Sequence, residues 1–315
     1  MEKRKAEHIR AGRGAAGRRI DNYLAGMLRD IPRSRIYRML RTGEVRVNGG
    51  RVRQDYRLQE NDDVRVPPLF QGPPRVQAAP PASLLNRLRK AVLYEDERLL
   101  AINKPAGCAV HAGSGEQFGV IALMRALRPD CRDLELAHRL DKATSGCLLL
   151  AKDQLYLREL HELLRHNRIH KHYLALVYGK LRKKLEISLP LRKNELRSGE
   201  RMVMVDATGK PATTVFHPVR ILRDATLVQV QIVTGRTHQI RVHAASSGHP
   251  VAGDPKYGDR AFNRRLRQAG LRRMFLHAER LVWQPNATLP PLSLHAPLPD
   301  DLQHFLDHYG TTERD

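Results

Sequence analysis

The chain has 315 residues, 41% of them hydrophobic, so it can bury a sizeable core, and wholesale disorder is excluded. Its 55 Lys and Arg residues against 33 Asp and Glu residues give a formal charge of +22, which favours nucleic acid as a partner over a merely solvated basic surface or an anionic membrane. Three cysteines without C-x-x-C spacing argue against a disulfide framework or a zinc ribbon and indicate a reducing, cytoplasmic compartment. No apolar run approaches the roughly 20 residues that a membrane span needs.

The N-terminal residues 1–17 are basic and rich in Gly and Ala, and they lack the apolar region of a secretory signal. We predict a disordered basic arm here; an organelle transit peptide is the alternative, which the two glutamates of this segment disfavour. Further along, residues 67–83 contain six prolines and no periodic apolar pattern, which predicts a semi-extended linker. The chain is therefore expected to carry a small module at 18–66 and a larger unit at 84–315.

Two amphipathic helices are predicted in the small module, the first over residues 20–28 and the second over residues 32–42. The second helix has its apolar side chains on one side and places Arg38 and Arg41 on the opposite side, with Arg35 at its margin. The apolar side is expected to face a core and the basic side to face outward.

Two short strand patterns follow, at residues 45–47 and 64–66, and a tight turn is predicted at Asn48-Gly49. The residues 18–65 contain 12 Arg and 7 acidic residues, a net charge of +5. This arrangement resembles the S4 RNA-binding domain, a small α/β module that lays an arginine-bearing helix along structured RNA. The resemblance lies in three segments: Arg19 to Leu24, Arg33 to Ile36 and Gly43 to Gly49. It implies RNA contacts from the three arginines of the second helix, with an ordinary solvated helix as the alternative.

The larger unit mixes strand and helix patterns without the strict alternation of a doubly wound sheet. Helical patterns cover residues 120–127 and 154–165, and a turn is predicted at 95–97 between two strand-like pieces. Strand patterns recur in four places: 147–151, 173–177, 226–233 and 276–283. We therefore predict an α+β fold with a largely antiparallel mixed sheet, in which Trp283 is a core residue.

A polar loop, from His138 to Gly146, stands directly before the apolar strand at 147–151. Within it, Asp141 is flanked by Arg139 and Lys142, and such a positive environment keeps a carboxylate ionised. An ionised and oriented carboxylate can act as a nucleophile or a base. A single Asp in a loop is more often a cap or a surface ion pair, so the surrounding residues decide between these interpretations.

The loop as a whole, His-Arg-Leu-Asp-x-x-Thr-Ser-Gly, resembles the sequence around the catalytic Asp in pseudouridine synthases of the large-ribosomal-RNA family. Other segments resemble the same family in the same order: Ile102 to Gly107 with Val110-His111, Lys171 to Gly179, and Thr234 to His243 with Gly248 to Asp254. With the S4-like module, the resemblance covers nearly the whole chain after residue 17. It implies a pseudouridine synthase fold and an isomerase that works without a cofactor.

The resemblance implies a catalytic set of Asp141, Tyr173 and Arg241. Asp141 would act at the ribose, either by attacking C1′ or by removing the C2′ proton, and Arg241 would hold it oriented and ionised. Tyr173 would stack on the uracil with its hydroxyl near C5, and Leu276 would pack near the base. Arg139 would fill the stack vacated by a flipped uridine, a phosphate contact being its alternative. Further substrate or RNA contacts are expected from five residues: His138, Leu140, Arg236, His238 and Lys104.

A metal site is not expected. His238 and His243 are five residues apart and Gln239 follows the first of them, so the H-E-x-x-H pattern of a zinc helix is lacking. The segment Gly113-Ser114-Gly115 lacks the Gly-Lys-Ser/Thr ending of a phosphate loop and is predicted to be a turn.

Within the family, residues 119–121, 198–203 and 258–262 look most like the C-type bacterial enzyme, which modifies several uridines near the peptidyl-transferase centre of 23S ribosomal RNA. The implied partner is 23S ribosomal RNA or a large-subunit assembly particle, with no membrane, and we expect a monomer. Three alternatives remain: a D-type enzyme that modifies other sites, an RNA-binding or ribosome-assembly factor that keeps the fold without catalysis, and an RNA methyltransferase. The last is disfavoured because we find no adenosylmethionine-binding loop.

Overall fold

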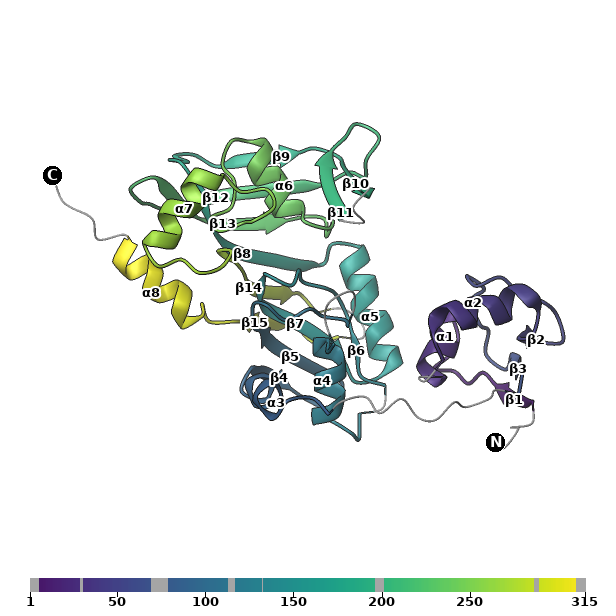
Figure 1. Cartoon of the computed structure of the whole chain (residues 1–315). Coiled ribbons are helices and arrows are strands. Elements are labelled where there is room, and N and C mark those ends of the chain that lie inside the picture. Colours follow the sequence, from purple (N-terminus) through teal and green to yellow (C-terminus); the bar gives the residue numbers. More distant parts are fainter. Residues whose placement is uncertain are drawn as a thin grey trace. The chain divides into compact units, whose positions relative to one another are not determined.

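Figure 1 shows the computed structural model of the chain, which describes residues 6–28, 31–68, 79–112, 117–131, 133–195, 201–285 and 289–309. The chain divides into two compact units, Met1–Ala79 and Pro80–Asp315. Within the described residues, no helix is both long and apolar enough to cross a membrane. Most of the predicted linker, the predicted turn at 113–115 and the segment 198–200 lie outside the described residues.

In its described part, the smaller unit packs two helices against a three-stranded antiparallel sheet of order β1-β3-β2. Its elements are β1 (Glu7–Arg10), α1 (Ile20–Met27), α2 (Arg33–Thr42), β2 (Arg46–Val47) and β3 (Asp63–Val66). The apolar residues that recur at helical spacing, among them Ile20, Leu24, Ile36 and Met39, are buried together in its core. The two predicted helices and the two predicted strands are confirmed.

The prediction of a disordered arm over residues 1–17 is wrong for the part that the structure describes, 6–17. Strand β1 pairs along its length with the edge of β3 that β2 leaves open. Beyond β1, Ala11 and Ala15 are buried in the core of the unit. A four-residue strand with Ile9 as its single apolar side chain is too short to show a detectable period of apolar residues. Its pairing partner, β3, lies far along the chain, so no local pattern indicates the pairing.

The tight turn predicted at Asn48-Gly49 is confirmed. Both residues have a positive φ, 49° and 76°, as a two-residue type I′ turn requires. Val47 and Gly50 exchange two backbone hydrogen bonds of 3.0 and 2.9 Å across it. Helix α2 ends at Gly43, whose φ of 73° is the left-handed conformation that glycine adopts without steric strain.

The larger unit is built on one mixed sheet, and among the pairings of described residues only β7 with β14 is parallel. The strand order is β4-β5-β7-β14-β8-β13-β12-β9, with β6 beside β7, β15 beside β14, and β10-β11 as a separate hairpin. The strands are β4 (Val92–Glu95), β5 (Leu99–Lys104), β6 (Glu135–Leu136), β7 (Ser145–Ala151), β8 (Ile169–Tyr178), β9 (Leu185–Ser188), β10 (Leu191–Glu195), β11 (Arg201–Val205), β12 (Thr213–Ile221), β13 (Ala225–Ile232), β14 (Leu276–Trp283) and β15 (Leu292–His295). The helices are α3 (Ala82–Arg89), α4 (Val120–Leu127), α5 (Gln154–Arg165), α6 (Gln239–Ser246), α7 (Arg260–Gln268) and α8 (Asp300–Tyr309). The predicted α+β class with a largely antiparallel sheet is confirmed.

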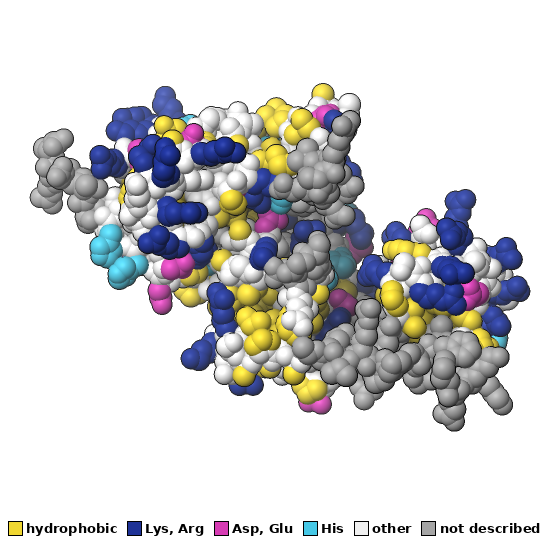
Figure 2. Space-filling view, in the orientation of Figure 1, with side chains coloured by type: hydrophobic (Ala, Val, Ile, Leu, Met, Phe, Trp, Pro, Cys, Tyr) yellow, Lys and Arg dark blue, Asp and Glu magenta, His cyan; other side chains and the backbone are white. Residues whose placement is uncertain are grey.

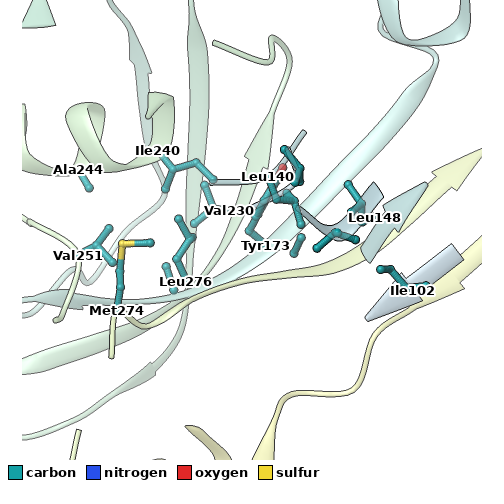
Figure 3. Packing of buried hydrophobic residues seen from close by; sticks show 14 of the residues in the cluster. Ile102, Leu140, Leu148, Tyr173, Val230, Ile240, Ala244, Val251, Met274 and Leu276 are labelled. Atoms are coloured by element: carbon teal, nitrogen blue, oxygen red, sulfur yellow. The ribbon is translucent and has the colours of Figure 1, made fainter. Parts of the chain in front are cut away.

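Two apolar cores lie on opposite faces of strand β7, whose residues are buried along its whole length. Leu148 enters the first core with residues of α3, α4 and α6, and Figure 3 shows Ile240 of α6 in that core. Leu149 enters the second core, where it is joined by Leu160 of α5 and by Trp283, which is buried as predicted. A strand buried on both faces holds the loop that precedes it rigidly.

Candidate active site

The loop that carries Asp141 is fixed at the end of β5. It closes on itself through a hydrogen bond from the Thr144 N–H to the Asp141 carbonyl oxygen (3.1 Å). The next carbonyl, that of Lys142, accepts hydrogen bonds from the Gly107 N–H (2.8 Å) and from the Lys104 ammonium (3.3 Å). Within the loop these contacts involve backbone groups alone, so the Asp141 carboxylate, 19% exposed, remains available to other groups.

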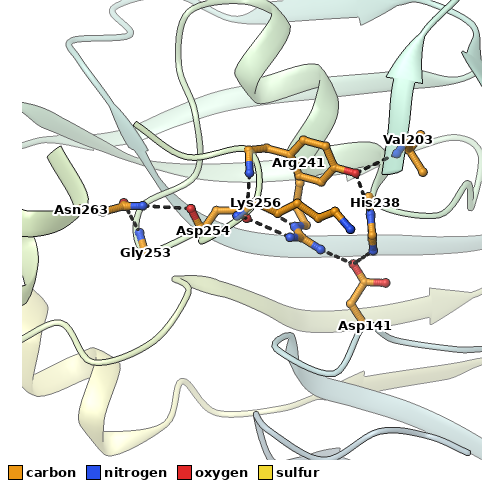
Figure 4. A network of polar contacts seen from close by, with 9 residues as sticks. Asp141, Val203, His238, Arg241, Gly253, Asp254, Lys256 and Asn263 are labelled. Carbon is orange, nitrogen blue, oxygen red and sulfur yellow. Dashed lines mark hydrogen bonds and ion pairs between the residues drawn. The ribbon is translucent and has the colours of Figure 1, made fainter. Parts of the chain in front are cut away.

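Arg241, on α6, joins two carboxylates (Figure 4). Its Nη1 donates to Oδ2 of Asp141 at 3.2 Å, while its Nε and Nη2 donate to the two oxygens of Asp254 at 2.7 and 2.8 Å. Burial by itself would lower the pKa of Arg241 and raise that of Asp254, but their hydrogen bonds and opposite charges reverse both shifts. The buried pair therefore stays charged at neutral pH.

His238 approaches the same carboxylate from the start of α6. Its Nε2 lies 3.7 Å from Oδ2 of Asp141, and its Nδ1 lies 2.9 Å from the hydroxyl oxygen of Tyr257. Burial lowers the pKa of His238, with Asp141 opposing the shift, so the imidazole is neutral near pH 7. His238 has a φ of 54°, a left-handed conformation that non-glycine residues adopt rarely and mostly where the surrounding structure imposes it.

The two donors meet at one oxygen of the carboxylate. Among the described residues, Arg241 and His238 both approach Oδ2 of Asp141, and in Figure 4 the other oxygen points away from the network. Two donors on one side hinder rotation of the carboxylate about its Cβ–Cγ bond. The structure thus presents one held oxygen and one free oxygen.

The carboxylate lines a pocket of about 80 Å³. The apolar walls come from Leu140, Ile232, Ile240 and Leu276, and the ring of Tyr173 completes them, as Figure 3 shows in part. Tyr173 is 8% exposed, and burial raises the pKa of its phenol, with the charge of Asp141 adding to the shift. An apolar slot with an aromatic wall suits a flat, uncharged ring, and the carboxylate stands where it can react with an attached group.

Known proteins are similar to this chain in sequence. The model of the RNA pseudouridylate synthase family matches residues 98–246, and the S4 domain model matches residues 18–64. The ribosomal large subunit pseudouridine synthase C of Pasteurella multocida is 51% identical, covering 92% of this chain and 90% of its own length. The protein of the same name from Escherichia coli (strain K12) is 48% identical, covering 92% of both chains. The chain belongs to the RNA pseudouridylate synthase family.

A solved structure of this family supports the same fold. Human RNA Pseudouridylate Synthase Domain Containing 4 superposes with a TM-score of 0.59 at 26% sequence identity, covering 72% of this chain and 95% of its own. The shared fold therefore extends over nearly all of the human chain.

The structure of this synthase brings together most of the residues that the sequence singled out. Eight of them line the one pocket: Arg139, Leu140, Asp141, Tyr173, Arg236, His238, Arg241 and Leu276. They come from the loop before β7, from β8, from the turn that leads into α6, from α6 itself and from β14. Arg139 is exposed at the pocket, so its guanidinium is accessible from solvent.

Two other residues that were expected to contact substrate or RNA, His138 and Lys104, form hydrogen bonds inside the protein and are not among the described residues that line the pocket, so their expected contacts stay predictions. The Nε2 of His138 accepts a hydrogen bond from the Leu149 N–H (3.2 Å), and burial lowers the pKa of this imidazole to about 4. Lys104 is fully buried and donates to three backbone carbonyls at 2.9 to 3.3 Å. Burial lowers its pKa to about 8, which leaves the ammonium charged at neutral pH. Both residues brace the loop that carries the carboxylate.

In the smaller unit, the three arginines of α2 differ. Arg38 and Arg41 are exposed, as predicted. Arg35 is half-buried, and Glu44 accepts two hydrogen bonds from its guanidinium at 3.2 and 2.7 Å. The basic face of α2 therefore consists chiefly of Arg38 and Arg41. Figure 2 shows further Lys and Arg side chains over the visible surface of both units.

The sequence did not identify Asp254 and Tyr257 as part of the site. Asp254 was noted only as the end of a family segment, and Tyr257 carried no signal. Asp254 lies 13 residues from Arg241, with a turn between them, so no helical or strand period relates the two. A charged residue directly after Gly253 was the one available indication.

Proposed function

We propose that this protein converts specific uridines of large-subunit ribosomal RNA into pseudouridine, with the carboxylate of Asp141 acting at the ribose. Its relatives at 48% to 51% identity are named ribosomal large subunit pseudouridine synthase C. The charge of +22 suits a large RNA, because each phosphate that a Lys or Arg neutralises releases counterions.

The observation that carries the proposal is the free oxygen of Asp141 beside an apolar pocket. Pseudouridine formation breaks the C1′–N1 bond, turns the uracil and joins its C5 to C1′. Oδ1 is the atom available to attack C1′ or to take the C2′ proton, while Arg241 and His238 hold Oδ2. The charge-assisted hydrogen bond from Arg241 keeps the carboxylate ionised and aimed, which either route requires.

Tyr173 and Leu276 provide the surfaces for the detached base. The ring of Tyr173 offers a face for stacking on uracil, and Leu276 closes the pocket. Because burial raises the pKa of the phenol, Tyr173 holds its proton at neutral pH. This favours stacking and hydrogen bonding near C5 over a phenolate that is ready to act as a base before the substrate binds.

A uridine in folded RNA must leave its stack to enter this pocket, at a cost of about a few kcal/mol. Arg139 is the candidate for filling the gap, since its exposed side chain stands at the pocket and a guanidinium plane can stack between bases. Arg38 and Arg41 of the S4 domain would add phosphate contacts farther along the RNA.

We further propose that the substrate is 23S ribosomal RNA or a large-subunit assembly particle, that the enzyme acts as a monomer, and that it works in the cytoplasm. The three cysteines lie unpaired in the structure, which suits a reducing compartment. A D-type enzyme acting at other uridines is the nearest alternative. Pseudouridine mapping of ribosomal RNA from a deletion strain, with and without the restored gene, distinguishes the two.

The deciding experiment is Asp141→Asn, assayed on ribosomal RNA by carbodiimide labelling and primer extension. We expect the rate to fall by at least roughly 10³-fold, as when other catalytic residues are removed, with RNA affinity retained. The matched control is Asp224→Asn, because this carboxylate pairs with Arg265 at the surface (2.9 Å). Unchanged stops with Asp141→Asn would refute the proposal. A wild-type protein that binds the RNA and modifies no uridine would instead indicate a non-catalytic assembly factor.

A further inference from the structure

One loop, residues 253–258, contacts both groups that hold the catalytic carboxylate. From this loop, Asp254 binds Arg241 and Tyr257 binds His238. Asp254 is fully buried and Tyr257 is half-buried, and the described residues that line the pocket include neither of them. Any effect of these two side chains on the reaction must therefore pass through the residues that they contact.

Asp254 determines the direction of one donor. A guanidinium is planar, and its five N–H groups form a rigid fork. Asp254 accepts from both Nε and Nη2 of Arg241, at 2.7 and 2.8 Å, and its own Oδ1 also accepts from the Lys256 N–H (2.9 Å). Because Nε and Nη2 are both held by Asp254, the orientation of the planar guanidinium is fixed. The remaining nitrogen, Nη1, is therefore directed at Oδ2 of Asp141 and donates to it.

Tyr257 determines which nitrogen of His238 carries the proton. The Tyr257 oxygen accepts a hydrogen bond from the Val203 N–H (2.9 Å), which leaves its own proton free to be donated to Nδ1 of His238. In this neutral tautomer the N–H is on Nε2, facing Asp141. The opposite tautomer would direct a lone pair at the carboxylate, so the charge of Asp141 favours the same assignment.

We infer that Asp254 and Tyr257 are positioning residues: they aim two N–H donors at one oxygen of Asp141 and so leave the other oxygen for the ribose. The inference rests on the proposed function, because a free oxygen matters only if the carboxylate acts on the substrate. One short loop thus sets both the orientation of the carboxylate and the choice of its reacting atom.

The loop is built to keep this geometry. Asn263 of α7 accepts from the Gly253 N–H (2.8 Å) and donates to the Asp254 carbonyl (2.9 Å). Gly253 has a φ of 70°, and a Cβ there would stand 2.4 Å from the Arg273 carbonyl oxygen, so this position requires glycine. On the other side, the hydrogen bond from Val203 ties Tyr257 to strand β11. The loop is braced at both of its functional side chains.

The first test is Tyr257→Phe, which removes the hydroxyl and keeps the ring that lies 5.0 Å from the Arg241 guanidinium. We expect the single-turnover rate on ribosomal RNA to fall about 10- to 100-fold, the size seen when supporting residues or an alignment of about 1 Å are lost. The dissociation constant for RNA and the amplitude of the single turnover should stay within twofold of the wild-type values. A merely structural defect would give the opposite result, because it lowers the fraction of active enzyme, and with it the amplitude, and leaves the rate constant unchanged. The matched control is Tyr94→Phe, whose hydroxyl bonds Asp96 at a surface turn.

A double-mutant cycle tests the route. Because Tyr257 acts through His238, adding Tyr257→Phe to His238→Asn should lower the rate by less than twofold. A further tenfold loss in the double variant would overturn the inference, as would a Tyr257→Phe enzyme with the wild-type rate.

Asp254→Asn supplies the parallel test, with Asp224→Asn as its control. We expect a rate loss of about 10²-fold with RNA affinity retained. If Asp254→Asn fails to fold, Tyr257→Phe and the cycle still decide the inference. If the wild-type enzyme forms pseudouridine and all these variants do so at the same rate, the positioning role is refuted and the proposed function stands. If the wild-type enzyme forms no pseudouridine, the proposed function itself is refuted.

Discussion

Replacing Gly146 with alanine tests how closely the sheet controls the pocket. Gly146 lies in β7 beside β14 with a φ of 115°, a region that is open almost solely to glycine. A Cβ at this position would stand 2.2 Å from the carbonyl oxygen of Ala278. Since non-bonded contact requires roughly 3.5 Å, β14 must move by about 1 Å to accept it.

The displacement has a computable cost. Overpacking costs about 1 to 3 kcal/mol, and forcing a non-glycine residue into this backbone region adds about 1 to 3 kcal/mol. We therefore expect Gly146→Ala to lose about 4 kcal/mol of unfolding free energy. Because β14 also carries Leu276 into the pocket, a shift of about 1 Å should lower the single-turnover rate by about 10²-fold.

Urea denaturation followed by circular dichroism measures the free energy of unfolding. Primer extension on ribosomal RNA measures the single-turnover rate. The matched control is Gly270→Ala, where φ is 103° and a Cβ would meet nothing within 4 Å. This variant carries the backbone strain without the clash, so it should lose about 1 to 3 kcal/mol and keep the wild-type rate. If Gly146→Ala is no less stable than Gly270→Ala, or is fully active, the sheet does not hold the pocket as argued.

Two further predictions concern pH and salt. Burial lowers the pKa of His138 to about 4, from 6.5 for an exposed imidazole. Between these two pH values the unfolded chain binds a proton at His138 that the folded protein does not bind. The free energy of unfolding therefore falls as the pH drops from 6.5 toward 4. At pH 5 the loss from this site is about 2 kcal/mol, and His138→Gln, measured by urea denaturation at pH 7.5 and 5, should show a smaller difference than wild type. Replacing Arg38 and Arg41 with Gln should reduce the slope of log affinity for RNA against log salt concentration by roughly 1 to 2.

Controls separate these effects from general damage. The pH prediction is contradicted by an unchanged pH dependence in His138→Gln. For the salt slope the control is Arg125→Gln, whose guanidinium binds Glu135 at 2.6 Å in the larger unit. Equal slopes for the double Arg38/Arg41 variant and for wild type would mean that α2 does not contact phosphate.

The local pattern of apolar residues was sufficient to predict several elements. Helices α4 and α5 begin and end where the helical period predicted, and β14 spans the predicted residues. Helix α6 was not predicted, because Gln239, Arg241 and His243 alternate with apolar residues, a period of two that does not indicate a helix. The family segments nevertheless located this helix as part of the site.

By itself, the sequence determined the family, the α+β class and the carboxylate, since these depend on residues that are contiguous or regularly spaced. The tertiary structure alone decided which oxygen of Asp141 is free, that Asp254 and Tyr257 support its donors, and that His138 and Lys104 form hydrogen bonds inside the protein. Asp141 and Arg241 are 100 residues apart. No local period can encode a contact at that separation, because the fold and not the spacing brings the two groups together.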